Sequence, residues 1–277
     1  MSEAEIVKAY YDADPALEWN RLERHWFEFE ITKHYLKKYL TGKKILDIGG
    51  GPGQYAIWLT KQGYDVTLID LSDGNIAFAK EKAAIARVHI RALQADARDL
   101  NILGDEVFDH VLLMGPLYHL FAEEDRIKCV HEACRHMRQN GLLFASFITL
   151  HAGLNYYLSE CPADIIQELT LAPEFFDHLA ESRSWYGKAF TEAGFIHPSE
   201  IEPFFEACCF EKVVLFAQEG VTGVAEPEIL DAGDEVKALY LKLSLSLCEK
   251  PDYFAYTQHL MYVGKRGVKY YEQKTKK

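Results

Sequence analysis

A short glycine-rich run early in the chain constrains the fold more than any other feature. Residues 43–48 form a short, largely apolar segment that leads into Gly49-Gly50-Gly51-Pro52-Gly53, and an apolar helical pattern begins at Tyr55. Glycine accepts the backbone conformations of a sharp turn and lets a ligand approach the main chain closely. A helix after such a turn offers unpaired amide groups at its N-terminus. The run therefore predicts a strand, a turn and a helix that together cradle a nucleotide-like ligand.

The same alternation of strands and helices continues along the chain. Apolar runs separated by helical patterns predict an α/β fold, a parallel sheet with helices on both faces. A chain of 277 residues is long enough for one such domain with an appendage. The expected strands are 45–48, 65–69, 90–94, 108–114, 142–148, 210–217 and 259–263, and the further expected helices are 73–86, 124–137, 199–208 and 229–248.

Three segments fall outside this alternation. Residues 3–40 hold no glycine and repeat apolar residues at helical intervals, which predicts two helices ahead of the main domain. From 150 to about 184 the strand pattern lapses and aromatic residues intervene, which predicts a helical insertion that covers a substrate, although each aromatic side chain could also be simple packing. We expect an N-terminal helical extension (1–40), a cofactor-binding core (41–149), a helical insertion or lid (150–184), the C-terminal part of the core sheet (185–264) and a frayed basic tail (265–277).

Acidic residues distinguish the glycine-rich run from a dinucleotide-binding fingerprint. Gln54 stands where that fingerprint has its third glycine, and Asp47, two residues before the first glycine, would repel a pyrophosphate but attract the amino group of an amino acid. Asp70 ends the second expected strand, where a carboxylate can accept hydrogen bonds from ribose hydroxyls. Asp96 follows the third strand, where it can accept from an adenine amine. Ribose, adenine and a charged amino acid together describe S-adenosylmethionine.

These motifs resemble those of the class I S-adenosylmethionine-dependent methyltransferases. Residues 46–53 are similar to their first motif, 66–70 to the second, 95–97 to the third and 108–113 to the fourth strand. The resemblance implies a doubly wound, mostly parallel seven-stranded sheet of the Rossmann-like methyltransferase type, with an antiparallel last strand and the cofactor over the carboxyl ends of the first strands. The cofactor-binding residues that we expect are Tyr11, Asp47, Gly49, Gly51, Gly53, Asp70, Leu71, Asp96, Ala97 and Met114.

The segment after the fourth expected strand, residues 114–120, is expected to face the reacting methyl group, because open sheets bind ligands at this edge. Members of the family that methylate nucleobases carry an Asn or Asp, two prolines and an aromatic residue here, and this chain does not. For an acceptor that must lose a proton, His119 is the first candidate base, with Tyr118 and His151 behind it. The alternative is that His119 only lines the site.

No metal site is predicted. Cys129, His131, Cys134 and His136 lie close together in the sequence, which invites a zinc interpretation. At ~100° per residue of a helix the two cysteines point apart, so one ion cannot collect all four side chains. An amphipathic helix is the better interpretation, and the six cysteines of the chain, which lack a framework spacing, are expected to be reduced thiols.

Charge narrows the class of function. With 30 basic and 42 acidic residues the net charge is −12, so no bulk positive field attracts nucleic acid or an anionic membrane, and no apolar stretch approaches the ~20 residues that span a bilayer. We expect a cytoplasmic methyltransferase that uses S-adenosylmethionine to methylate an O, N or C nucleophile of a small-molecule acceptor by in-line displacement. The alternatives are an RNA or protein methyltransferase, a non-catalytic subunit that binds the cofactor, and a nicotinamide-dependent oxidoreductase. The sequence does not decide whether the protein forms a homodimer.

Overall fold

The computed structural model describes residues 1–159, 161–166 and 173–267. Its core strands are β1 (Lys44–Ile48), β2 (Asp65–Asp70), β3 (Arg91–Gln94), β4 (His110–Leu113), β5 (Leu142–Ile148), β8 (Phe210–Ala217) and β9 (His259–Arg266). They form one seven-stranded sheet in the order β3-β2-β1-β4-β5-β9-β8. The pairs among β1 to β5 are parallel, whereas β9 runs antiparallel to both of its neighbours. The expected mostly parallel sheet with an antiparallel last strand is confirmed.

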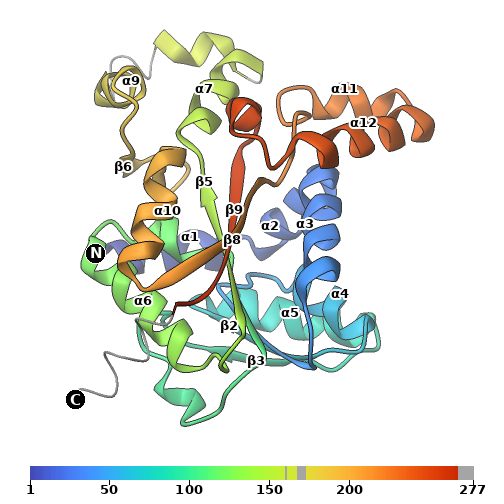
Figure 1. The fold of residues 1–277 in the computed structure, drawn as a ribbon, viewed down its shortest axis with the longest axis vertical. Helices are drawn as coiled ribbons and strands as arrows, with labels where there is room; N and C mark the ends of the chain where they lie inside the picture. The colour runs from blue at the N-terminus through green and yellow to red at the C-terminus, as the bar shows by residue number, and fades with distance from the viewer. Residues whose placement is uncertain (160, 167–172, 268–277) are drawn as a thin grey trace.

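Helices cover both faces of this sheet (Figure 1). On one side lie α3 (Trp26–Tyr39), α4 (Gln54–Lys61) and α5 (Asp73–Ile85), and on the other lie α6 (Glu123–Arg135) and α10 (Pro198–Ala207). Because both faces are covered, the central strands are continuous apolar runs, and Ile45, Leu46 and Ile48 of β1 are fully buried.

The expected helix over 229–248 is two helices, α11 (Glu226–Asp231) and α12 (Asp234–Leu247). Gly233 separates them at a φ of +99°, which a residue with a side chain rarely adopts. The remaining short helical turns are η1 (Asn101–Leu103), η2 (Pro116–His119) and η4 (Pro251–Tyr256). No helix in the described part of the chain is both long enough and apolar enough to cross a membrane.

The N-terminal extension holds three helices where the sequence predicted two. They are α1 (Glu3–Ala13), α2 (Pro15–Arg24) and α3. The break that the periodicity missed lies at Asp14, whose carboxylate accepts hydrogen bonds from the amides of Ala16 and Leu17, while Pro15 occupies the first helical position. The helix α1 contacts α5 and η2, so the extension lies across the carboxyl ends of the parallel strands.

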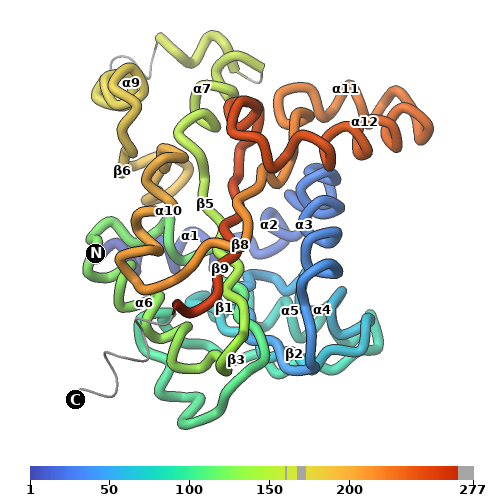
Figure 2. Tube along the Cα trace, in the orientation of Figure 1, coloured from blue at the N-terminus to red at the C-terminus, as the bar shows by residue number. Residues whose placement is uncertain are grey.

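A cap lies above the carboxyl end of β5. It contains α7 (Leu150–Ser159), η3 (Pro162–Asp164) and α9 (Pro173–Ala180), and then a hairpin of β6 (Trp185–Lys188) and β7 (Glu192–Phe195) that the sequence analysis did not predict (Figure 2). Phe175, Trp185 and Phe195 belong to a buried cluster separate from the main core. The expected boundary at 184 therefore falls inside the cap. Residues 160 and 167–172 of the expected insertion, and 268–277 of the expected tail, lie outside the described residues.

Glu226 ties the N-terminal extension to the C-terminal half of the chain. Its buried carboxylate accepts a hydrogen bond from the Phe27 amide (2.9 Å) at the start of α3 and lies 3.3 Å from Nδ1 of His25. The helix α3 has no side-chain cap within its own sequence, so this distant carboxylate satisfies one of its unpaired amides.

Glu226→Ala is expected to lower the free energy of unfolding by about 1–3 kcal/mol, because it leaves a buried amide without an acceptor. Urea titration of the variant and the parent protein measures this difference. Glu226→Gln keeps an acceptor oxygen and should lose less. Equal unfolding midpoints for the alanine variant and the parent would contradict the assignment.

Candidate active site

The glycine-rich turn between β1 and α4 adopts backbone angles that exclude side chains. Gly49, Gly51 and Gly53 have φ values of +72°, +55° and +86°, in the left-handed region. A Cβ on Gly49 would lie 2.4 Å from Cδ of Pro116, so the turn passes directly against the segment after β4. The turn is therefore held between two loops at the carboxyl edge of the sheet.

Asp70, the last residue of β2, fixes this turn. Its Oδ2 accepts from the Gly51 amide at 2.8 Å, and its Oδ1 accepts from the Ser72 amide at 2.9 Å and from Nδ2 of Asn75 at 3.2 Å. A carboxylate has about four acceptor positions, so one on Oδ2 is left for a ligand. Burial raises the pKa of Asp70, and the three donors oppose this shift. The side chain is placed to accept from a ribose hydroxyl, as the sequence predicted, and this role stays a prediction.

Asp47 lies behind the turn and not in a cavity wall. A Cβ on Gly50 would approach Oδ2 of Asp47 to 2.7 Å, and both carboxylate oxygens are buried without a hydrogen-bond partner among the described residues. Burial, with a contribution from Asp70, raises the pKa of Asp47 to about 7. A cation above the turn would stabilise the ionised form of Asp47, so this unpartnered carboxylate fits a ligand with an ammonium group. The role of Asp47 as a cofactor-binding residue stays a prediction.

Asp96 is held by a neighbouring arginine. Its carboxylate accepts from Nε and Nη2 of Arg98, and Nη1 of Arg98 lies 2.5 Å from Asp125. Burial raises the pKa of Asp96, but these bonds and the charge of Arg98 outweigh it, so the pKa falls below its usual value. Asp96 stays ionised and lines the cavity described next, although much of its accepting capacity is already used.

A cavity of about 140 Å³ lies over these residues, and we call it the cofactor cavity. The helices α1 and α2 close it from above, through Val7, Tyr11 and Arg21 among others. The expected cofactor-binding residues in its wall are Tyr11, Gly49, Gly51, Asp70, Leu71, Asp96, Ala97 and Met114. Gly53 is not among its lining residues and packs against Ala79.

A larger cavity of about 1140 Å³ lies under the cap, and we call it the aromatic cavity. Its wall includes Tyr10, Tyr156, Tyr157, Phe175, Trp185 and Phe190. Five residues line both cavities, and we call them the junction: Tyr11, Glu18, Arg21, Tyr118 and His259. Aromatic walls suit an organic ligand, and the junction gives such a ligand a place to meet a cofactor.

Both ring nitrogens of His119 are hydrogen-bonded. Nδ1 of His119 lies 2.7 Å from the backbone oxygen of Glu192, to which it donates, so Nε2 accepts from the hydroxyl of Tyr11 at 3.0 Å. Burial lowers the pKa of His119 to about 4, despite the bond to Glu192. Both nitrogens are thus in use and the protonated form is disfavoured, which weakens the hypothesis that His119 is a base. The partner Glu192 belongs to the hairpin that the sequence analysis missed.

The two other candidate bases differ in position. Tyr118 is in the junction, and burial raises its pKa, so it is a neutral hydroxyl. His151 lies on α7, lines neither cavity and has its ring centroid 6.3 Å from that of His197. The structure thus brings Tyr118 and His119 to the cofactor cavity and leaves His151 outside it.

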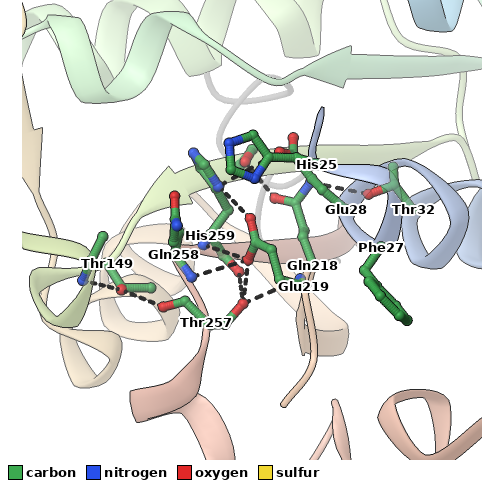
Figure 3. A network of polar contacts seen from close by, with 12 residues as sticks. His25, Phe27, Glu28, Thr32, Thr149, Gln218, Glu219, Thr257, Gln258 and His259 are labelled. Atoms are coloured by element: carbon green, nitrogen blue, oxygen red, sulfur yellow. Dashed lines mark hydrogen bonds and ion pairs between the residues drawn. The ribbon is translucent and has the colours of Figure 1, made fainter. Parts of the chain in front are cut away.

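A buried charged cluster beside the junction was missed by the sequence analysis. It consists of Arg21, Glu28, Glu219 and His259, and Figure 3 labels the last three. The guanidinium of Arg21 is bidentate to Glu28, at 2.6 and 3.2 Å, and Nδ1 of His259 lies 2.6 Å from Oε1 of Glu219. The only signal for it in the sequence is that Glu219 follows β8 and His259 opens β9, which are adjacent at the carboxyl edge.

The charges of this cluster depend on one another. Burial alone would raise the pKa of Glu219, but His259 and the hydrogen-bond donors around the carboxylate lower it to about 2. Burial disfavours protonation of His259, but Glu219 and Glu28 outweigh it and raise the pKa of His259 above its usual value. Glu219 is therefore ionised, and the imidazole is held by two carboxylates.

The cysteine-rich helix is a packing element. Cys129 and Cys134 are buried on α6, whereas His131 is exposed. The six cysteines of the chain are free thiols.

Comparisons with known proteins agree with the fold and the motifs. A family model described as a methyltransferase domain matches residues 45–141. A glycine/sarcosine N-methyltransferase of Parasynechococcus marenigrum is 32% identical over 141 residues, which cover 50% of this chain and 49% of that protein. A ubiquinone biosynthesis O-methyltransferase of Rickettsia akari is 32% identical over 119 residues, 43% of this chain and 45% of that protein. The chain spans about half the length of these relatives.

Solved structures match over more of the chain. A magnesium protoporphyrin IX methyltransferase of Synechocystis, solved with bound S-adenosylhomocysteine, gives a TM-score of 0.59 at 14% identity and covers 96% of this chain and 100% of its own. An S-adenosylmethionine-dependent methyltransferase of Thermotoga maritima gives a TM-score of 0.58 at 15% identity. The match covers 94% of this chain and 99% of that one. At such identities the likeness concerns the fold alone.

Replacing Asp70 tests the cofactor cavity. Asp70→Ala is expected to weaken binding of S-adenosylhomocysteine by about 1–3 kcal/mol, or roughly 5- to 150-fold, because a charge-assisted bond is lost and the turn loses its anchor. Isothermal titration calorimetry measures the change. The matched control is Asp65→Asn at the exposed first residue of the same strand, which should bind normally. Unchanged affinity in Asp70→Ala would remove this residue from the site.

Proposed function

We propose that the chain is a class I S-adenosylmethionine-dependent methyltransferase that transfers a methyl group to a nucleophile of a small-molecule acceptor. The observation that carries the proposal is the junction, where the cofactor cavity and the aromatic cavity share five residues. A cofactor held by the glycine-rich turn and an acceptor held under the cap would meet there. The two reactants then need only the correct orientation and the exclusion of water.

The residues of the cofactor cavity fit S-adenosylmethionine. Asp70 has an accepting position for a ribose hydroxyl, and Asp47 provides negative charge behind the turn for an ammonium group. When bound, this cofactor supplies a methyl group already activated on a sulfonium. The protein's own part is to bind and orient, through Met114 and Tyr118 on one side and Tyr11 on the other.

A small organic acceptor suits the aromatic cavity. Its volume of about 1140 Å³ is somewhat above the roughly 300–1,000 Å³ of pockets that bind drug-sized ligands, so it has room for such an acceptor. The net charge of −12 argues against RNA as the acceptor. The names of the two relatives, a glycine/sarcosine and a ubiquinone biosynthesis methyltransferase, support a small-molecule acceptor as well.

Ligand-dependent melting tests cofactor choice. S-adenosylmethionine and S-adenosylhomocysteine are expected to raise the melting temperature, because a ligand at a hundredfold excess over its dissociation constant stabilises the fold by about 2.7 kcal/mol. NADH and NADPH should leave it unchanged, since Asp47 and Gln54 disfavour a pyrophosphate. A larger shift with NADH would contradict the cofactor assignment.

Transfer itself is tested with a cofactor labelled in its methyl group. The labelled cofactor is incubated with a metabolite extract, with a panel of phenols, alcohols, amines and thiols, and with bulk RNA and protein. The proposal expects label in one or more small molecules. Label confined to RNA or protein would support a macromolecular acceptor, and no label in any fraction would support a binding protein without turnover.

Phe190→Ala tests the acceptor site. Phe190 lies on the hairpin loop, with its ring centroid 5.8 Å from that of Tyr10 and 6.1 Å from that of His119. Loss of an aromatic contact worth about 0.5–1.5 kcal/mol should raise the KM of the acceptor roughly 2- to 12-fold and leave cofactor affinity unchanged. Leu239→Ala, on the exposed face of α12, is the control. A change in cofactor affinity alone would place Phe190 outside the acceptor site.

A further inference from the structure

His259 lies where the two cavities meet. It is the first residue of β9 and pairs with Ile148, the last residue of β5, so it stands at the carboxyl edge of the sheet. Its ring lines both the cofactor cavity and the aromatic cavity. A side chain in this position can reach an acceptor that faces the methyl group.

Glu219 determines which ring nitrogen of His259 faces the cavities. Oε2 of Glu219 accepts from the amides of Gln258 and His259, at 3.1 and 2.9 Å, and from the hydroxyl of Thr257, while Oε1 lies 2.6 Å from Nδ1 of His259 (Figure 3). An ionised carboxylate only accepts, so Nδ1 carries the hydrogen. The lone pair of the neutral ring is then on Nε2, which has no hydrogen-bond partner within the described residues, and the side chain is 13% exposed.

The groups around the ring favour its protonated form once a proton arrives. Glu219 is in contact, and Oε2 of Glu28 lies 3.9 Å from Nδ1. Arg21 opposes them but is bound to Glu28 and to Glu18. The pair His25 and Glu226 lies at the start of α3 nearby. An imidazolium here completes a balance of two carboxylates and two cations, without a lone buried charge.

We propose that His259, oriented by Glu219, accepts the proton of the acceptor during methyl transfer, and that the acceptor group is a hydroxyl. This inference rests on the proposed function. The hydroxyl oxygen forms a bond to the methyl carbon, the carbon–sulfur bond breaks with its electron pair going to sulfur, and the hydroxyl proton goes to Nε2 of His259. Atoms and charge balance: the sulfonium becomes a neutral thioether and the imidazole becomes an imidazolium.

A hydroxyl is the acceptor that gains most from such a base. An amine that enters the cavity uncharged already presents a nucleophilic lone pair, whereas an alcohol or phenol is a weak nucleophile until its proton leaves. His259, paired with the Glu219 carboxylate, can take up the hydroxyl proton at the edge of a cavity lined by aromatic rings. The substrate class is therefore a hydroxylated, largely apolar organic molecule.

The same cluster is a candidate metal site by spacing, and its hydrogen bonds disfavour that reading. Ligand atoms of Glu28, Glu219 and His259 lie within 4.8 Å of one another, one such group among the described residues. The carboxylate of Glu28 is occupied by Arg21, and that of Glu219 already receives four donors. A cation would have to displace a guanidinium that is already paired.

The first test needs no acceptor. Nitrogen-15 NMR of histidine-labelled protein with bound S-adenosylhomocysteine reads the tautomer and titration of each ring, with His259 assigned through His259→Gln. The proposal predicts that the neutral ring of His259 carries its hydrogen on Nδ1 and none on Nε2. The titration midpoint of this ring should lie above that of an ordinary histidine and should fall in Glu219→Gln. Hydrogen on Nε2, or loss of the His259 signal on adding one equivalent of Mn²⁺, would overturn it.

The second test follows turnover with the acceptor recovered from the phenol and alcohol panel. A base acts in its neutral form, so the rate should rise with pH through the raised pKa of His259. His259→Gln should lose about 10²- to 10⁴-fold in kcat with cofactor affinity within twofold. Glu219→Gln should move the rising part of the pH–rate profile to lower pH, a change that a purely structural role would not produce. His131→Gln, exposed on α6, is the control.

The two proposals fail in different ways. If S-adenosylhomocysteine binds and label is transferred but only to amines, and His259→Gln keeps full kcat, the hydroxyl inference is wrong and the methyltransferase proposal stands. If label is transferred to nothing, the proposed function is wrong, and with it the inference.

Discussion

The contacts of one carboxylate hold the site together. The carboxylate of Asp70 accepts hydrogen bonds from the amide of Gly51 in the turn after β1 and from the amide of Ser72 at the start of α5. The hydroxyl of Ser72 in turn donates to Asp12 of α1 at 2.6 Å. A chain of hydrogen bonds therefore joins the glycine-rich turn, a sheet helix and the N-terminal extension that covers the cofactor cavity. Because these bonds are buried or half-buried, leaving any one partner unpaired is costly, so the ligand-binding turn is fixed before a ligand arrives.

The second constraint is electrostatic. The junction stands beside a buried cluster of two carboxylates, a guanidinium and an imidazole, in which each charge is tolerated only because its neighbour compensates it. Such a cluster adds little to the free energy of unfolding, since well-packed apolar side chains in its place would stabilise the fold as well. Its imidazole belongs to a residue that lines both cavities, which is why we propose a chemical use for the cluster.

The sequence predicted the fold well and the site in part, for physical reasons. Strand periodicity, the glycine run and the acids at or near the carboxyl ends of β1, β2 and β3 are local signals, and the sheet they predict is the one observed. The hairpin around Phe190 has no such signal, because it is stabilised by packing against α7 and α9 and not by a turn motif. His259 and Glu219 were missed because only the antiparallel pairing of β8 and β9 brings them together. His119 was the first candidate base because it follows β4, and its two hydrogen bonds could not be predicted because their partners lie 108 and 73 positions away.

If a methyl group is transferred at the junction of the two cavities, a crystal structure with bound S-adenosylmethionine should show it there. We expect a ribose hydroxyl on Oδ2 of Asp70 and the methyl group directed past Met114 toward Tyr118 and His259, with room for an acceptor atom at about 3–3.5 Å from the methyl carbon. A cofactor whose methyl group is directed away from the aromatic cavity, or whose ribose lies elsewhere than on Asp70, would contradict it.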